Sequence, residues 1–352
     1  MKKRGGVLSL GAILSAVLVF FGVYFYVVEV APVKIRSINS ENIIENNYTV
    51  DSLTVKCLEH TPTVTFAIAG DVMLDRSVWH SFKDKGLTKI FEDFDQTIFT
   101  DKDFALLNLE GPISSEPIND DWKSGSMVFN FPPESTDVLN HLGIDVISLA
   151  NNHSQNAGIK GLSYTREILD DEKIKYFGSE DSFNWDNVVR LNTEIPITLI
   201  GINTLPEFEN GDIINVIKSE KADGQFVIVM PHWGNEYQSV HNSHQENWAK
   251  SWIGAGTDAI IGSHPHVVQD VEIIDNVPVV YSLGNFVFDQ MFSKETQEGL
   301  IVTGELTDEK LVLKFVPTIQ RKIYVDEMTE VNSSKLISNI LKIESNSIEL
   351  TR

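Results

Sequence analysis

Side chains that bind metals or transfer protons follow short apolar stretches at six places in this chain. They are Asp71 after VTFAIAG, Asn108 and Glu110 in FALLNLE, Asn151, Asn152 and His153 after VISLA, His232 at the end of FVIVMPH, His264 and His266 after AIIGS, and Asn285 and Asp289 after VPVVYSLG. In an open α/β sheet, ligands bind beyond the carboxyl ends of the strands. Carboxylate, amide and imidazole groups without thiolates suit one or two divalent cations. The pattern therefore predicts a metal site at that edge.

The stretch IIGSHPHVVQD, residues 260–270, is the most informative of the six. A strand that ends in a rigid bend is where α/β folds place binding groups. Two imidazoles at i and i+2 in an irregular turn can converge on one point, whereas a helix would bring together only residues i and i+3 or i+4. We expect His264 and His266 to face a cation site, one for each of two metals, with Pro265 fixing their divergence.

Each position alone also has a structural interpretation. Gly-Asp after a strand is typical of a turn or helix N-cap, and Asn suits left-handed turns. Arg76, five residues after Asp71, is either a clamp for a substrate phosphate or carboxylate, or a surface arginine paired with an acid. Trp233 and Tyr237 either line the site or belong to the core. The six coincident placements favour the functional interpretation of the set.

The elements that carry these residues have the pattern of an α/β fold. Near-continuous apolar strands alternate with helical stretches such as STDVLNHLG and SHQENWAKSWIGAG, which predicts a sheet covered on both faces. Residues 299–318 predict an antiparallel hairpin that turns at 307–309. We expect one domain over 62–320. A tail over 321–352 would carry a surface helix, with Leu336, Ile340 and Ile343 on one stripe.

The first thirty residues predict a membrane anchor. Lys2, Lys3 and Arg4 precede 24 uncharged residues from Gly5 to Val28, about 36 Å of helix, enough to cross a hydrocarbon core of roughly 30 Å. Positive charge before the span places the N-terminus in the cytoplasm and the main domain outside the cell. A cleaved signal peptide is the alternative. Residues 31–61 would form a polar stalk, with an edge strand near 53–57.

Composition limits the partners of the exported part. Residues 31–352 hold 25 basic and 49 acidic side chains, a formal charge of −24. Such a surface repels nucleic acid, so no nucleic-acid partner is expected. The chain has one cysteine, which excludes an intrachain disulfide framework.

Six motifs in fixed order resemble one family. GDVML, NLEGP, ANNH, PHWGNEY, GSHPH and YSLGNFVFD, spread over residues 64–290, are similar to those of the CapA-type poly-γ-glutamate and capsule synthesis proteins. That family is similar in turn to the calcineurin-like metallophosphoesterases. The resemblance implies a four-layer αββα sandwich, whereas patterning alone suggests a single sheet between helices.

The resemblance also implies roles for individual residues. Asp71, Glu110 and His266 match ligands of a first metal, and Glu110, Asn152, His232 and His264 match ligands of a second. His153 matches the histidine that assists the leaving group. One position departs from the phosphoesterase pattern, because Met73 stands where Asp-x-His has histidine. A thioether does not readily replace imidazole for a hard cation, which puts the first site in doubt.

Three functions follow as hypotheses. The first is a membrane-anchored, extracytoplasmic protein of poly-γ-glutamate or capsule biosynthesis with a metal-dependent hydrolase-like site, holding Mn, Fe or Zn and acting on a phosphoester or γ-glutamyl amide. The second is a non-catalytic polymer-binding, assembly or export factor that works with other membrane proteins. The third is a general surface metallophosphoesterase. The methionine at position 73 favours the second, and His153 favours the first.

Overall fold

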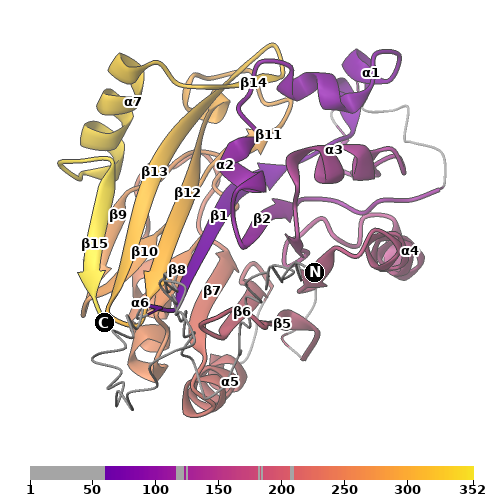
Figure 1. Cartoon of the computed structure of the whole chain (residues 1–352). Coiled ribbons are helices and arrows are strands. Elements are labelled where there is room, and N and C mark those ends of the chain that lie inside the picture. The colour runs from indigo at the N-terminus through magenta and orange to yellow at the C-terminus, as the bar shows by residue number, and fades with distance from the viewer. Residues whose placement is uncertain (1–59, 116–122, 124–125, 181–182, 184, 207–209) are drawn as a thin grey trace, which may run out of the picture. The chain divides into compact units, whose positions relative to one another are not determined.

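The computed structural model describes residues 60–352 apart from 116–122, 124–125, 181–182, 184 and 207–209 (Figure 1). One unit spans Pro62–Arg352. The predicted anchor, stalk and edge strand near 53–57 lie outside the described residues. Among the helices that are described, none is both long and apolar enough to cross a membrane.

The first sheet has nine strands within the described chain. Its order is β14-β13-β12-β1-β2-β3-β4, with β11 paired to β1 and β15 to β13. Strands β1 to β4 run parallel, and β12 pairs antiparallel with β1. The bounds are β1 Thr63–Val72, β2 Phe104–Leu109, β3 Val146–Ser148, β4 Lys175–Phe177, β11 Asn285–Val287, β12 Glu298–Thr307, β13 Lys310–Arg321, β14 Tyr324–Glu327 and β15 Ser347–Thr351. The predicted hairpin corresponds to β12 and β13.

The second sheet has six strands in the same part of the chain, in the order β5-β6-β7-β8-β10-β9. Strands β6, β7, β8 and β10 are parallel, and β5 and β9 close the edges antiparallel. The bounds are β5 Val188–Leu191, β6 Ile197–Asn203, β7 Phe226–His232, β8 Ala259–Ile261, β9 Val271–Ile274 and β10 Val277–Val280.

The two sheets pack face to face, because their strands alternate between two apolar surroundings. In β7, Phe226 and Ile228 enter the core shared by both sheets, whereas Val227 and Val229 pack under helices α5 and α6. In β1, Phe66 and Ile68 enter the shared core, and Ala67 and Ala69 face the outer core of the first sheet. The single sheet that patterning suggests is therefore wrong, and the layers are those of a sheet-rich α/β sandwich.

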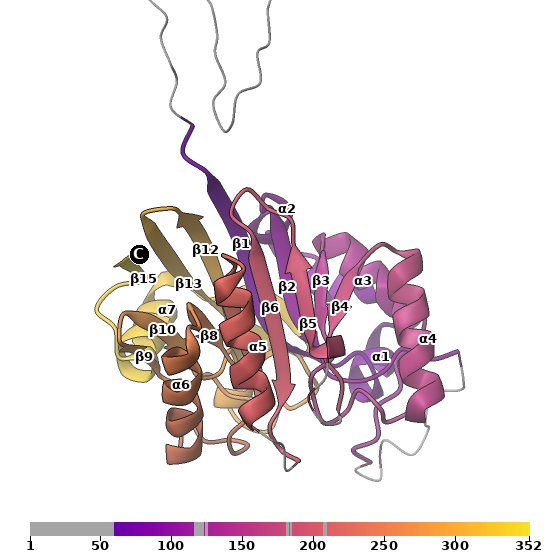
Figure 2. The same ribbon diagram turned by 90° about the horizontal axis from the view of Figure 1, so that it is seen from below.

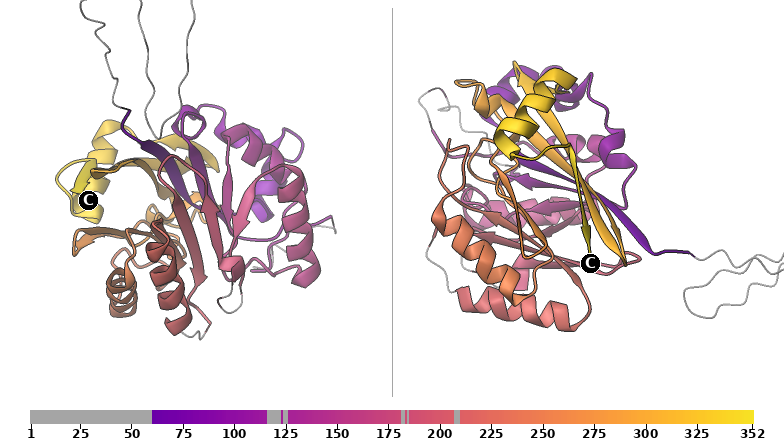
Figure 3. Two further views of the ribbon diagram at one scale, coloured as in Figure 1. Left: turned by 60° about the horizontal axis from the view of Figure 1, so that its bottom comes forward. Right: turned by 90° about the vertical axis from the view of Figure 1, so that its left-hand side faces the viewer.

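Helices cover both outer faces (Figure 2). On the first sheet they include α1 Arg76–Phe82, α2 Thr97–Thr100, α3 Ser135–Leu142 and α4 Gly158–Asp171, with the short turn η1 Leu87–Phe91. On the second sheet they are α5 Asn210–Ala222 and α6 Ser243–Ala255, which lie side by side in Figure 3. Short turns occur at η3 Trp185–Asn187 and η4 Glu295–Gln297. Helix α6 begins with a capping box between Asn242 and Gln245 and ends at Gly256 in the left-handed conformation.

The structure does not divide at residue 320, where the sequence suggests a tail. Strands β14 and β15 both pair with β13, so residues 321–352 extend the first sheet. The predicted surface helix is α7 Glu330–Leu336, continued by the π-helical turn η5 Ile337–Leu341. Its apolar stripe packs on the core between the sheets, where Leu336 is buried and Ile340 and Ile343 are partly buried. The half-exposed edge strand β15 is only weakly apolar, which hides it in the sequence.

The chain crosses from the second sheet to the first between β10 and β11. At this crossover Gly284 O accepts the Asp71 N–H at 3.0 Å. A Cβ on Gly70 would lie 2.0 Å from the same oxygen, so only glycine allows this approach. The close contact sets the carboxyl end of β1 beside the segment that leaves the second sheet.

Candidate metal centre

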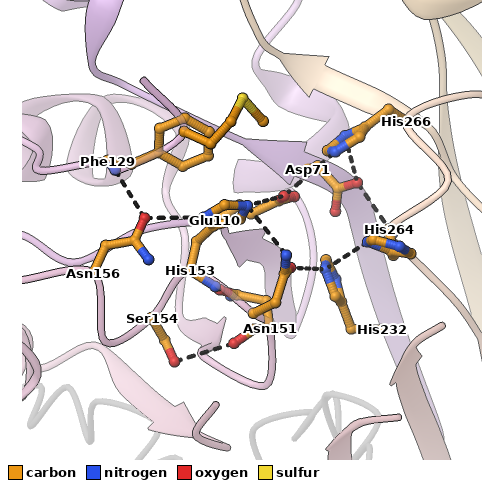
Figure 4. Close-up of polar contacts among 12 residues, drawn as sticks. Asp71, Glu110, Phe129, Asn151, His153, Ser154, Asn156, His232, His264 and His266 are labelled. Carbon is orange, nitrogen blue, oxygen red and sulfur yellow. Dashed lines mark hydrogen bonds and ion pairs between the residues drawn. The ribbon is translucent and has the colours of Figure 1, made fainter. Parts of the chain in front are cut away.

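The predicted residues come together where the carboxyl ends of both sheets meet (Figure 4). In the first sheet, Asp71 lies at the end of β1, Glu110 follows β2, and Asn152–His153 follow β3. In the second sheet, β7 ends at His232, and β8 leads to the turn with His264 and His266. Asp71, Glu110 and the three imidazoles of the second sheet are buried, as is His153, and Asn152 is half-buried.

Asp71 is held from both sides. Its Oδ1 accepts from Asn108 Nδ2 at 2.7 Å, and its Oδ2 accepts from the His264 backbone N–H at 3.2 Å. Asn108 is itself fixed by Asn151 Nδ2, which donates to its Oδ1 at 3.0 Å. The strand-end amides of the first sheet thus position the carboxylate rather than offering themselves as ligands.

Glu110 lacks the hydrogen-bond donors that hold Asp71. Both of its carboxylate oxygens are buried and, among the described residues, accept no hydrogen bond from an N–H donor or a hydroxyl group; the polar group that they face is the carboxyl group of Asp71. His266 Nε2 lies 3.5 Å from Oε1, and His153 Nε2 lies 3.9 Å from it. A buried carboxylate without hydrogen bonds is costly unless it is protonated or bound to a cation.

His232, His264 and Asn152 form a compact donor group. His232 Nε2 lies 2.8 Å from Asn152 Oδ1 and 3.2 Å from His264 Nδ1. Ligand atoms about 2.1 Å from one tetrahedral ion are roughly 3.4 Å apart, so this spacing is close to that of a coordination shell. Ser263 Oγ, 3.0 Å from His232 Nδ1, holds the other side of that ring.

His266 is oriented by Asn285, the first residue after the crossover. Asn285 Nδ2 donates to Gln290 Oε1 and to the Thr296 carbonyl, so its Oδ1 accepts from His266 Nδ1 at 3.0 Å. This arrangement leaves the Nε2 lone pair facing Glu110. His264 and His266 have φ values of 97° and 57°, conformations that cost on the order of 1–3 kcal/mol each in non-glycine residues. Such strain is typical of functional sites.

His153 is oriented in the same manner by Asn156. Asn156 Oδ1 accepts the Phe129 backbone N–H at 2.8 Å, and the same oxygen lies 2.9 Å from His153 Nδ1. His153 therefore carries its proton on Nδ1, and its Nε2 faces Glu110 and the Asn152 amide, 3.2 Å away. The Phe129 ring packs on the imidazole with 4.3 Å between centroids.

Burial shifts the ionisation of these groups in opposite directions. It raises the pKa of Asp71 to about 7, and together with the charges of Asp71 and Glu236 it raises the pKa of Glu110 well above its usual value. Burial lowers the pKa of His264 to about 4 and that of His266 to about 3, and it lowers the pKa of His153 and His232. The imidazoles are therefore neutral at neutral pH, as metal ligands must be.

These residues fit one or two divalent cations. Two groups of three have ligand atoms that all lie within 4.8 Å of one another, one formed by Asp71, Glu110 and His232 and the other by Glu236, His264 and His266. The unpartnered oxygens of Glu110 supply the negative charge that a cation would neutralise. The mixed oxygen and nitrogen donors suit Mn, Fe or Zn.

The remaining predicted residues lie at the margin of the centre or outside it. Arg76 forms an ion pair with Asp289, 3.2 Å from Nε to Oδ2, and its guanidinium lies over Phe129 at 5.7 Å. Met73 is buried in the outer core of the first sheet, where its sulfur accepts the Asp75 N–H at 3.2 Å. Trp233 belongs to the core, whereas Tyr237 is partly exposed and stacks on His266.

Sequence reasoning did not assign four residues that shape the centre. Asn156, Ser263 and Asn285 orient imidazoles, and Glu236 joins His264 and His266 in a ligand group. Asn285 stands among the strand-end residues and Glu236 follows His232 by four positions, which was the available signal. Nothing in the pattern marks Ser263 or Asn156, because their roles depend on contacts across the fold.

Comparison with known proteins agrees with this geometry. A family model described as "Bacterial capsule synthesis protein PGA_cap" matches residues 65–290, the region that carries every predicted site residue. The chain belongs to this capsule synthesis family. The match confirms the resemblance drawn from the six sequence motifs.

Individual members of the family are distant relatives. The chain is 27% identical to the capsule biosynthesis protein CapA of Bacillus anthracis, over 72% of this chain and 67% of that protein. It is 27% identical to the PGA biosynthesis protein CapA of Bacillus subtilis strain 168, over 67% and 66% respectively. The chain thus spans about two thirds of the length of these relatives. A probable polyglutamine synthesis accessory protein of Mycobacterium tuberculosis is 24% identical, over 69% of this chain and 73% of that protein.

Among solved structures, that of TT1561 from Thermus thermophilus has a TM-score of 0.38 and 9% identity, covering 68% of this chain and 94% of that one. A likeness at this level informs neither the fold nor the function of the capsule synthesis protein.

Proposed function

We propose that this chain is a membrane-anchored, extracytoplasmic protein of poly-γ-glutamate or capsule biosynthesis whose folded domain is a metal-dependent hydrolase. The observation that carries the proposal is the buried Glu110 carboxylate, unpartnered in the described structure and facing His153 and His266. The names of the Bacillus relatives support the biosynthetic context. The anionic polymer is the proposed substrate.

The ligands divide as the family resemblance implies. Asp71, Glu110 and His266 would hold one cation, and Glu110, Asn152, His232 and His264 a second. When bound, these ions would lower the pKa of a coordinated water and neutralise the charge that develops on the substrate's phosphoryl or carbonyl oxygen.

His153 would move the proton in this reaction. It is neutral, with Nδ1–H donated to Asn156, and its Nε2 lone pair faces Asn152 Nδ2 and the carboxyl group of Glu110. It would accept a proton at Nε2 and donate it to the departing oxygen or nitrogen. Arg76, beside the ring of Phe129, would bind a carboxylate or phosphate of the substrate, and its pairing with Asp289 holds it in place.

Met73 supports a second candidate function. Its burial in the outer core leaves the first metal site without the imidazole of the phosphoesterase pattern. A protein with one weak site is suited to hold the polymer through a cation, as a non-catalytic assembly or export factor that contacts other membrane proteins.

One experiment separates these functions. The purified full-length protein would be assayed for bound metal and for hydrolysis of an aryl phosphodiester and of poly-γ-glutamate. His153→Ala would keep its metal and lose turnover by roughly 10²–10⁴-fold if the protein is an enzyme. His244→Ala, an exposed histidine on α6, is the matched control and would behave as the wild type.

The other outcomes point elsewhere. Bound metal without any turnover supports the assembly role. Turnover of the diester alone supports a general surface phosphoesterase. Absence of bound metal contradicts the metal centre itself.

The anchor has a separate test. Residues 5–28 would place the folded domain outside a single-pass membrane segment with a cytoplasmic N-terminus. Protease added to intact cells should then digest the domain, and the N-terminal fragment should stay with the membrane. A domain that is protected in intact cells would contradict this orientation.

A further inference from the structure

We propose that Glu236 is a metal ligand of this centre, supplying the donor that Met73 cannot. This inference rests on the proposed metal centre. Its ligand atom and those of His264 and His266 all lie within 4.8 Å of one another. His264 and His266 are also ligands in the two sets that the family resemblance implies, so Glu236 would add a carboxylate donor beside these two imidazoles.

The position of Glu236 is set by the backbone on both sides of it. The Trp233 N–H donates to the Ser263 carbonyl at 3.1 Å, and the Tyr237 N–H donates to the Pro265 carbonyl at 2.8 Å. Residues 233–237 are thereby tied at both ends to the His-Pro-His turn. Glu236 lies inside this segment, and its carboxylate is within reach of the two imidazoles.

The local conformation of this segment is specified by residues at positive φ. Gly234 has a φ of 89°, and a Cβ there would lie 2.7 Å from the Gln245 side chain. Tyr237 has a φ of 61°, while its ring stacks on His266. Gly234 and Tyr237 on this loop therefore lie next to His264 and His266 on the turn, and all four have positive φ values. In non-glycine residues such conformations are strained and persist only where the surrounding structure enforces them.

Charge favours a cation at the same place. Asp71, Glu110 and Glu236 place three carboxyl groups at one cluster of imidazoles, where their negative charges repel one another. A divalent ion between Glu236 and the two histidines would relieve this repulsion.

Exposure distinguishes Glu236 from the other ligands. Asp71, Glu110 and the three imidazoles are buried, whereas Glu236 is exposed. Removing its charge should therefore leave the fold intact, so a change in metal binding can be separated from unfolding.

The test is metal binding by the full-length protein. Mn²⁺ or Zn²⁺ would be titrated calorimetrically into metal-free protein, and bound metal would be counted by mass spectrometry. Glu236→Gln and Glu236→Ala should weaken one site at least tenfold or remove one ion, while thermal unfolding of the metal-free protein stays unchanged. Glu236→His, which restores a donor, should bind more tightly than Glu236→Ala. Glu305→Gln, an exposed carboxylate on β12, is the control and should bind as the wild type.

The results discriminate between the two proposals. If Glu236→Gln and Glu236→Ala bind metal as tightly as the wild type, this inference is overturned and the metal centre stands. A wild-type protein that binds no metal overturns both. A loss shared equally by Glu305→Gln would show a general charge effect and would also overturn the inference.

Discussion

The two sheets contribute chemically different halves of the candidate centre. The first sheet supplies oxygen donors, Asp71, Glu110 and Asn152, at the ends of neighbouring parallel strands. The second sheet supplies three imidazoles, His232, His264 and His266. The negative charge lies on the first half, together with Glu236 at the margin of the second. Neither sheet alone would form the centre, which exists only because the sandwich brings the two edges together.

The two halves of the centre also reduce the stability of the fold for different physical reasons. In the first sheet the cost is electrostatic, because Asp71 and Glu110 are buried and Glu110 has no hydrogen bond among the described residues. In the second sheet the cost is conformational, because His264 and His266 have positive φ values. A bound cation would neutralise the buried carboxylates of the first sheet. It would also bind to the imidazoles that the strained backbone of the second sheet holds in place. The predictions below test this division.

Disrupting the close contact between β1 and the crossover segment should have the largest effect on the stability of the protein. Gly70→Ala would place a Cβ 2.0 Å from the Gly284 oxygen, so the crossover and β1 must separate. We expect a loss of about 3 kcal/mol in the free energy of unfolding. Urea denaturation measures this loss. Gly211→Ala, on α5 with open space at its Cβ, is the control and should not destabilise the fold.

Removing the central oxygen donor should separate binding from folding. Glu110→Gln removes a buried carboxyl group whose ionised form is unfavourable, as its raised pKa indicates, so the metal-free protein should unfold at the same or a higher temperature. Metal affinity should fall by more than about 100-fold, since even residues that only orient ligands contribute 10–100-fold. Calorimetric unfolding with and without Zn²⁺ checks both statements. A marked loss of stability in the metal-free variant would contradict the electrostatic account of this half.

Removing the hydrogen bond that orients His266 should have a smaller effect on metal affinity. Asn285→Ala removes the acceptor of His266 Nδ1–H, so the ring can rotate or change tautomer. We expect metal affinity to fall by about 10–100-fold. Titration with Mn²⁺ measures the change. Asn276→Ala, an exposed asparagine in the β9–β10 turn, should leave affinity unchanged. Wild-type affinity in Asn285→Ala would show that backbone strain alone fixes His266.

The pH dependence of metal binding should come from the oxygen half. Protons and cations compete for Asp71 and Glu110, because burial raises the pKa of Asp71 to about 7 and that of Glu110 well above its usual value, so affinity should rise at least about tenfold per pH unit as the pH approaches 7. The imidazoles, with pKa values of about 4 and 3 for His264 and His266, are already neutral in that range and add no slope. Calorimetry at pH 6, 7 and 8 measures this. Asp71→Asn should reduce the slope and leave the contribution of Glu110, and an unchanged slope in that variant would assign the competing proton to Glu110 alone.

Much of the first half of the centre could be predicted from the sequence. Apolar strands followed by Asp71, Glu110 or Asn152 are local patterns, and parallel neighbours bring their ends to one edge. The role of Glu236 was not predicted, because its distance to His264 depends on how one loop pairs with another. Asn285 and Ser263 were likewise not assigned as orienting residues, since hydrogen-bond partners across the fold leave no mark in the spacing.

The sequence by itself determined which chemistry is present and on which strand ends it stands, because side-chain type and strand termination are local properties. The pattern of apolar strands did not show that there are two sheets, because either a helix or another sheet can cover each face of a buried strand. The family resemblance implied two sheets, and the tertiary structure decided it. It also decided that residues 321–352 belong to the fold. Asp71 and His264 hydrogen-bond across 193 positions of the chain, and contacts of that range follow from packing rather than from sequence pattern.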